Sequence, residues 1–215
     1  IQRIEKLFTT FDPNSQTNLI NEYAGIKPVV VDEEVFKLIE RSITISNLTQ
    51  GAFDITYGSI DKGLWNFDTN MTALPSREIA KKMVYLINYR NIILNNEESS
   101  VMLLNKGMRI GFGGIGKGYA AEMAKKKLVE RNVLSGIINA SGDLTTWGTQ
   151  ASGKPWTIGI AHPDNPNSAV SYLNLSGKAI ATSGNYEKFI TINGKKFPHT
   201  IDPKTGFPVT GIKSV

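Results

Sequence analysis

A two-residue turn signal in the last quarter of the chain constrains its fold more than any other feature of the sequence. Asn193-Gly194 separates two β-rich runs, residues 189–192 and 195–201. This dipeptide favours the type I′ turn of a β-hairpin, because both of its residues tolerate positive φ. The second run leads into Asp-Pro-Lys-Thr-Gly at 202–206, a series of turn-forming residues. The chain must therefore contain antiparallel strands, and it presents His199 beside a turn.

The other periodic segments fall into groups of helices and groups of strands. We expect helices at residues 1–10, 33–51, 76–87 and 116–132, and strands within 27–32, 90–95, 100–105, 108–114, 135–149, 155–163 and 171–177. Strands in neighbouring runs, with helices between the groups, predict an α+β fold with mixed or antiparallel sheets packed against helices. We expect one compact domain over residues 1–215. In an alternative form of this domain, residues around 50–75 make a small lobe.

Composition narrows the functional classes. Lys and Arg exceed Asp and Glu by 24 to 19, which gives a net charge of +5. The positive residues are scattered, so a nucleic-acid partner is not expected, whereas an anionic ligand such as a nucleotide suits this charge. The chain has no cysteine, which excludes disulfides and thiolate metal sites.

The two ends of the sequence look incomplete. Ile1, Ile4 and Leu7 already follow a helical spacing with no capping residue before them, and "GIKSV" stops at the start of a strand-like run. We therefore expect the chain to be truncated at both ends. No apolar run reaches the length of a membrane span, and no signal peptide is visible.

A glycine-rich stretch, "GFGGIGKGYAAE" at 111–122, lies between a strand-like and a helical segment and includes Lys117. Backbone N–H groups of such a loop can approach a phosphate closely, and the helix N-terminus adds partial positive charge. The stretch is neither a Walker A loop nor a convincing dinucleotide fingerprint. A tight connection without a ligand fits the pattern as well as a phosphate cradle does.

Three further stretches contain polar or aromatic residues of the kind that bind ligands. "GAFDITYG" at 51–58 pairs Phe53 with Asp54, either to hold an aromatic ligand or to pack a core and cap a turn. "INASGDLTTWG" at 138–148 is either a binding strand end or a plain turn. His199 is either structural or an acid–base group, since a neutral imidazole can accept a proton near pH 7.

Taken together and in this order, the stretches "GAFDIT", "GGIGKGYA", "INASGDL", "ATSGNYEKF" and "HTIDPKTGFP" resemble the FAD:protein FMN transferase family, the ApbE-type flavin transferases. The resemblance extends over most of the chain. It implies a T-fold-like α+β architecture and Mg²⁺-dependent transfer of FMN from FAD to a Thr or Ser hydroxyl of an acceptor flavoprotein subunit, with release of AMP. It also implies an exported periplasmic or cell-surface protein, with a lipid anchor to the membrane outside this chain.

The same resemblance suggests roles for individual residues. Ala52, Phe53 and Asp54 match the family's Ala-Phe-Asp contact with FAD, and Phe11 falls near an aromatic position on the flavin side. The remaining matches are Lys117 facing the FAD phosphates, Thr200 contacting FAD, His199 as the proposed base, and Gly114 at a metal-ligand position where only its carbonyl can serve.

Two departures from the family pattern keep other readings open. The family usually has Asp before the glycine loop where this chain has Gly111, so one FAD contact is either missing or supplied from elsewhere. The family's metal-binding Asp and Thr are expected beyond Val215. A non-catalytic flavin-binding protein and a Mg²⁺-dependent FAD pyrophosphatase, which gives FMN and AMP, are therefore the alternatives to the transferase.

Overall fold

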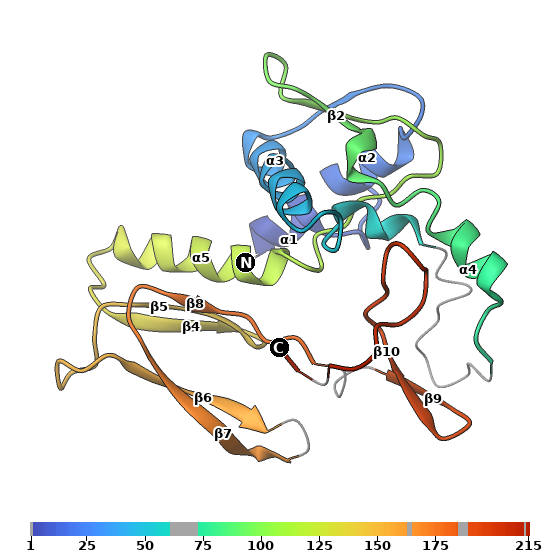
Figure 1. Cartoon of the computed structure of the whole chain (residues 1–215). Coiled ribbons are helices and arrows are strands. Elements are labelled where there is room, and N and C mark those ends of the chain that lie inside the picture. Colours follow the sequence, from blue (N-terminus) through green and yellow to red (C-terminus); the bar gives the residue numbers. More distant parts are fainter. Residues whose placement is uncertain (1, 61–72, 163–164, 185–188, 213) are drawn as a thin grey trace. The chain divides into compact units, whose positions relative to one another are not determined.

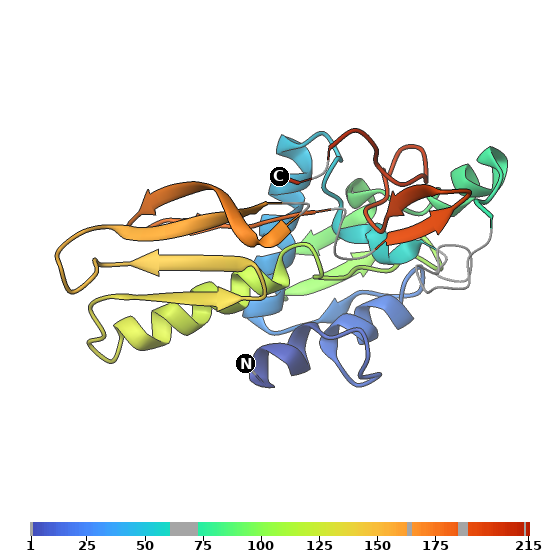
Figure 2. The same ribbon diagram turned by 90° about the horizontal axis from the view of Figure 1, so that it is seen from below.

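The computed structural model describes residues 2–60, 73–162, 165–184, 189–212 and 214–215. These residues form two compact units. The first contains the described residues of 2–114 and 189–210, and the second those of 115–188 and 211–215. Figure 1 gives the elements of both, and Figure 2 shows the same ribbon from below. The predicted small lobe around residues 50–75 falls largely on residues 61–72, which lie outside the described part of the chain.

The first unit contains most of the helices. Capping residues explain several of their starts: Ser15 Oγ accepts from Asn18 N, and Ser76 Oγ accepts from Ile79 N. The helices are α1 (Gln2–Phe8), α2 (Gln16–Glu22), α3 (Glu33–Leu48) and α4 (Arg77–Met83), with short 3₁₀ turns η1 (Ile55–Ser59) and η2 (Tyr89–Asn91).

Two small antiparallel sheets complete this unit. One has the order β1-β3-β2 and consists of β1 (Val29–Val30), β2 (Ile92–Asn95) and β3 (Ser100–Leu103). The other is the predicted hairpin of β9 (Phe189–Ile192) and β10 (Lys195–Pro198). Asn193 and Gly194 have φ of 50° and 75°, as a type I′ turn requires.

The core of the first unit is built from the inner faces of α3, β3 and the loop after it. Val35, Phe36 and Ile39 of α3 are buried, as are Val101 and Leu103 of β3. Spacing of three to four residues puts the α3 side chains on one face, as the sequence pattern predicted. Ile190 and Ile192 of β9 and Phe197 of β10 form a smaller buried cluster within the hairpin.

The prediction of a strand within residues 108–114 is wrong, because this segment is a loop held by side chains. Asn21 Oδ1 accepts from Ile110 N at 2.7 Å, and Asn21 Nδ2 donates to Ile110 O at 3.1 Å. Gly111 N donates to Ile55 O at 3.0 Å. The backbone groups that a neighbouring strand would have paired are thus satisfied locally, and Ile110 still enters the core.

The second unit packs one helix on a small sheet. Helix α5 (Gly116–Val129) lies along strands β4 (Gly136–Ala140) and β5 (Asp143–Trp147), and β8 (Ala179–Ile180) pairs with β5. Thr145 of β5 donates to Glu122 of α5 at 3.1 Å, which ties the helix to the sheet. Strands β6 (Trp156–His162) and β7 (Asn165–Leu175) form a separate antiparallel pair.

The fold class is α+β, as predicted, because every strand pair among the described residues is antiparallel, so no helix there links two parallel strands. The prediction of one domain over residues 1–215 stays a prediction. No helix in the described ranges is long and apolar enough to cross a membrane.

Gly206→Ala is expected to destabilise the first unit more than an ordinary glycine substitution. Gly206 has φ of +73°, and a Cβ there would collide with the Ala80 carbonyl and lie 2.8 Å from its carbon. We expect the free energy of unfolding to fall by about 2 kcal/mol or more, because left-handed backbone strain and overpacking act together. Chemical denaturation measures this loss. Gly194→Ala is the matched control, since its φ is +75° with open space around the Cβ. Equal losses at the two positions would contradict the close packing at Gly206.

Candidate functional site

The loop of residues 111–114 is held between Asn21, Ile55 and two aromatic rings. Tyr57 Oη accepts from Gly113 N at 3.0 Å. A Cβ at Gly114 would lie 3.2 Å from Cε2 of Phe53, so the Phe53 ring lies directly beside that glycine. The structure therefore brings together two predicted site residues, Phe53 and Gly114, from segments about sixty positions apart.

The predicted site residue Asp54 is buried and already engaged by protein donors. Its Oδ1 accepts from Thr56 N at 2.8 Å and from Thr56 Oγ1 at 2.7 Å. Its Oδ2 accepts from Tyr89 N at 3.0 Å, and Thr56 Oγ1 in turn accepts from Asn88 N at 2.8 Å. A carboxylate offers about four acceptor positions, so little capacity remains for a ligand. Asp54 thereby fixes the loop that carries Phe53.

Ala52 precedes this network and is exposed. Its N–H donates to Thr49 O at 3.0 Å, just beyond the end of α3. The Ala52 carbonyl and methyl group are the parts of the residue that remain for a ligand, so its predicted FAD contact stays a prediction. The same holds for the contact predicted for Phe53.

His199 and Thr200 are both exposed and follow β10 directly. Phe197 and Pro198 before them are buried, and Val209 N donates to Thr200 O at 2.9 Å. The backbone on both sides of the two residues is therefore anchored, while their side chains face outward.

The turn after His199 is closed by Asp202. Asp202 Oδ1 accepts from Lys204 N at 2.9 Å, and Oδ2 accepts from Thr205 Oγ1 at 3.1 Å. Asp202 O accepts from Gly206 N at 2.9 Å. The bond from Lys204 N is that of an Asx turn, and the other two close the loop around it, which explains why Asp, Pro and Gly occur here together.

Lys117 belongs to the second unit, near the start of α5. Its Nζ donates to Ser141 O at 3.2 Å and lies 4.0 Å from Asp143 Oδ1. Ser141 and Gly142 have φ of 57° and 96°, and form the turn between β4 and β5. The stretch "INASGDL", which the sequence left open between a binding segment and a turn, is a turn that holds Lys117 by a carbonyl and a carboxylate.

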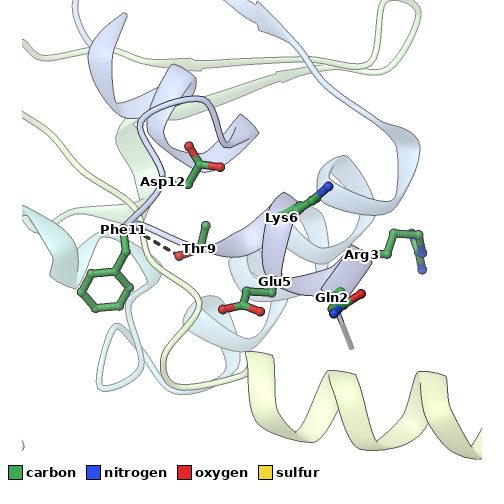
Figure 3. Close-up of a pocket in the computed structure, with 7 residues that line it drawn as sticks. All are labelled: Gln2, Arg3, Glu5, Lys6, Thr9, Phe11 and Asp12. Carbon is green, nitrogen blue, oxygen red and sulfur yellow. Dashed lines mark hydrogen bonds between the residues drawn. The ribbon is translucent and has the colours of Figure 1, made fainter.

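Phe11 is the most exposed large apolar side chain among those described, with 92% of its surface accessible. It borders a hollow of about 790 Å³ beside α1, lined by Gln2, Arg3, Glu5, Lys6, Thr9, Phe11 and Asp12. Figure 3 shows these side chains, with the Phe11 N–H donating to Thr9 Oγ1 at 3.1 Å. Of the predicted site residues, only Phe11 lines this hollow, and its place beside a flavin stays a prediction.

The described residues do not by themselves build a magnesium site. They contain no group of three or more His, Cys, Asp or Glu side chains placed to hold a metal ion. Magnesium prefers octahedral oxygen ligands that include carboxylates. The carbonyl of Gly114 alone does not satisfy that preference, so its role as a metal ligand stays a prediction.

One residue at these places was not identified from the sequence. Tyr57 covers the backbone of Gly111 and Gly113. The sequence does contain one signal for Tyr57. An aromatic residue in a loop of small residues can pack against a second loop that is rich in glycine. Asp143 lies in the stretch "INASGDLTTWG", which the sequence left open between a binding strand end and a plain turn. Its pairing with Lys117 had no local signal, because Lys117 is 26 positions earlier in the chain.

Comparisons with known proteins identify the family of the chain. The sequence model of the ApbE family matches residues 1–215. A FAD:protein FMN transferase from Klebsiella pneumoniae is 31% identical over 210 residues, which cover 97% of this chain and 64% of that protein. A protein of the same name from Treponema pallidum is 29% identical and is matched over 63% of its length. The chain thus spans somewhat less than two thirds of these relatives.

Solved structures give the same family resemblance in three dimensions. The ApbE protein from Thermotoga maritima aligns with a TM-score of 0.88 at 34% identity, over 99% of this chain and 68% of that one. The flavin transferase ApbE from Vibrio cholerae aligns with a TM-score of 0.84 at 22% identity, over the same shares of the two chains, which supports the fold alone.

Proposed function

The chain belongs to the ApbE family, and from this premise we propose that it transfers FMN from FAD to a Thr or Ser hydroxyl of an acceptor flavoprotein. One observation carries the proposal: nearly the whole chain is similar to relatives named FAD:protein FMN transferase. The anchored position of His199 after a hairpin supports it, because a transferase needs an accessible base on a fixed backbone.

In the proposed reaction, the acceptor hydroxyl oxygen attacks the phosphorus on the FMN side of the FAD pyrophosphate. A new P–O bond joins FMN to the protein, the bond to the AMP phosphate breaks, and AMP leaves. His199 accepts the proton of the attacking hydroxyl. By the family resemblance alone, Lys117 offsets negative charge on the pyrophosphate. Within its own unit its ammonium group is half-exposed.

The glycine loop suits a pyrophosphate on physical grounds. Gly113 and Gly114 are exposed and lack side chains, so a charged group can approach their backbone closely. Phe53 beside Gly114 provides an apolar surface at the edge of that approach. Magnesium dependence is part of the proposal by family resemblance only.

The experiment that tests the function follows the intact mass of a Thr-containing acceptor protein incubated with this protein, FAD and Mg²⁺. We expect a gain of one FMN with release of AMP, and loss of that gain in EDTA. An unchanged acceptor mass with FAD split to FMN and AMP would favour the pyrophosphatase instead. An unchanged mass with intact, bound FAD would favour a flavin-binding protein without turnover.

We also propose export to the periplasm or cell surface and attachment to the membrane by a lipid outside the described chain. The support is the family resemblance alone. Fractionation of cells, followed by immunodetection with and without detergent, tests it; protein found only in the cytosolic fraction would contradict it.

A further inference from the structure

We propose that Tyr57 is a FAD-binding residue, whose hydroxyl donates a hydrogen bond to a pyrophosphate oxygen at the glycine loop of residues 111–114. This inference rests on the proposed function and names a binding residue for it. The resemblance to the family assigned no role to Tyr57.

The Tyr57 hydroxyl lies beside the backbone of the glycine loop. Tyr57 Oη lies 3.0 Å from Gly113 N, and Cβ atoms built on Gly111 and Gly113 would lie 3.0 and 2.5 Å from it. The phenol therefore occupies the space that side chains at these two positions would fill. All of these residues belong to the first unit.

The Tyr57 hydroxyl can donate one hydrogen bond and can also accept. The Gly113 N–H donates to the Tyr57 oxygen. Among the described residues, no acceptor is found for the Tyr57 O–H. Burial raises the pKa of the Tyr57 phenol, against the opposing effect of the Gly113 N–H, so the group keeps its proton at neutral pH.

A hydroxyl donor beside a glycine loop suits a phosphate ligand. Phosphate oxygens only accept hydrogen bonds, and glycine loops admit them to the backbone. The Tyr57 hydroxyl lies over two glycines and already accepts a hydrogen bond. Its O–H donor therefore suits an anionic oxygen of a ligand, and not a ligand group that is itself a donor. Tyr57 as a whole is 42% exposed, so a ligand can reach it.

Gly111 stands where the family usually has Asp. A Cβ at Gly111 would lie 3.0 Å from Oη and 3.3 Å from Cζ of Tyr57. A carboxylate at residue 111 and the phenol of residue 57 thus compete for one space. The hydroxyl supplies from residue 57 the polar contact that Gly111 cannot make.

The test is a titration of the wild-type protein and Tyr57→Phe with FAD, ADP and riboflavin in the presence of Mg²⁺. We expect FAD and ADP, which both carry a pyrophosphate, to bind the variant about tenfold more weakly. Riboflavin, which lacks phosphate, should bind both proteins equally. The melting temperature should change little, because water can replace the phenol at the exposed Gly113 N–H. Tyr85→Phe is the matched control, since Tyr85 is 77% exposed in the same unit.

A pair of substitutions tests the shared space independently. Gly111→Asp alone is expected to weaken FAD binding, and Tyr57→Val alone likewise. The double variant should bind FAD better than the sum of the two losses predicts, because removing the ring makes room for the carboxylate. Purely additive losses would contradict the competition for space.

The outcomes separate this inference from the function on which it rests. Equal FAD affinity of wild type and Tyr57→Phe would overturn the inference and leave the transferase proposal intact. Weaker binding of riboflavin to the same extent as FAD would also overturn it, by showing a loss that does not involve phosphate. A wild-type protein that binds no FAD would overturn both.

Discussion

His199→Ala is expected to lower the rate of FMN transfer by about 10²–10⁴-fold, the usual contribution of a general base. FAD affinity should stay roughly as in the wild type, because the side chain acts on the acceptor hydroxyl. The fold should also persist, since His199 is exposed and the anchoring bonds around it are made by backbone atoms and by Asp202. The measurements are the rate of acceptor mass gain and the dissociation constant of FAD.

His162→Ala is the matched control for this experiment. It removes the other histidine of the chain, which ends β6 in the second unit. We expect it to transfer FMN at close to the normal rate. If His199→Ala also kept the normal rate, His199 would not be the base; if it lost FAD binding in proportion to rate, its role would be in binding.

Asp54→Ala is expected to destabilise the first unit by about 3 kcal/mol or more. The substitution removes the acceptor of three protein donors, Thr56 N, Thr56 Oγ1 and Tyr89 N, at a buried position. Each buried donor left unsatisfied costs about 1–3 kcal/mol. Such a loss is a large share of the stability of a typical domain. Chemical denaturation measures it, and FAD affinity should fall too because Phe53 is on the same loop.

Two further variants make the result at Asp54 interpretable. Asp54→Asn keeps one acceptor oxygen but places an NH₂ group near a backbone donor, so an intermediate loss is expected. Asp32→Ala removes an exposed carboxylate that accepts from Gln16, and about 1 kcal/mol or less is expected there. A loss at Asp54→Ala no larger than that at Asp32→Ala would show that the three hydrogen bonds contribute little.

Local sequence signals predicted the elements whose causes lie within a few residues. Ser76 begins α4 by capping Ile79 N, three positions later. Asn193 and Gly194 form the predicted turn because positive φ is a property of the residues themselves. Asp202 closes its turn with donors two and three residues away. In each case the interacting residues are only a few positions apart, so the local sequence is enough to predict the interaction.

The predicted site residues were recognised from their motifs, but their roles depend on distant partners. Asp54 matched a ligand contact in sequence, yet its carboxylate is engaged by donors up to 35 positions away. The segment 108–114 was predicted to be a strand. The side chain of Asn21, which is 89 positions from Ile110, instead binds the backbone of Ile110 and holds the segment as a loop. Tyr57 was unassigned because nothing near it in sequence shows that its hydroxyl meets Gly113.

The sequence by itself determined the α+β class, the helices α1, α3, α4 and α5, the hairpin and the turn that follows His199, because short-range backbone preferences and apolar periodicity fix these features. Helix α2 (Gln16–Glu22), which Ser15 caps, was not predicted. Only the tertiary structure decided which polar groups are used up internally and which remain for a ligand. Hydrogen-bond satisfaction of a buried group depends on atoms brought together from across the chain. This is why the structure engages Asp54 within the protein, while no acceptor for the hydroxyl proton of Tyr57 is found in the part of the chain that the structure describes.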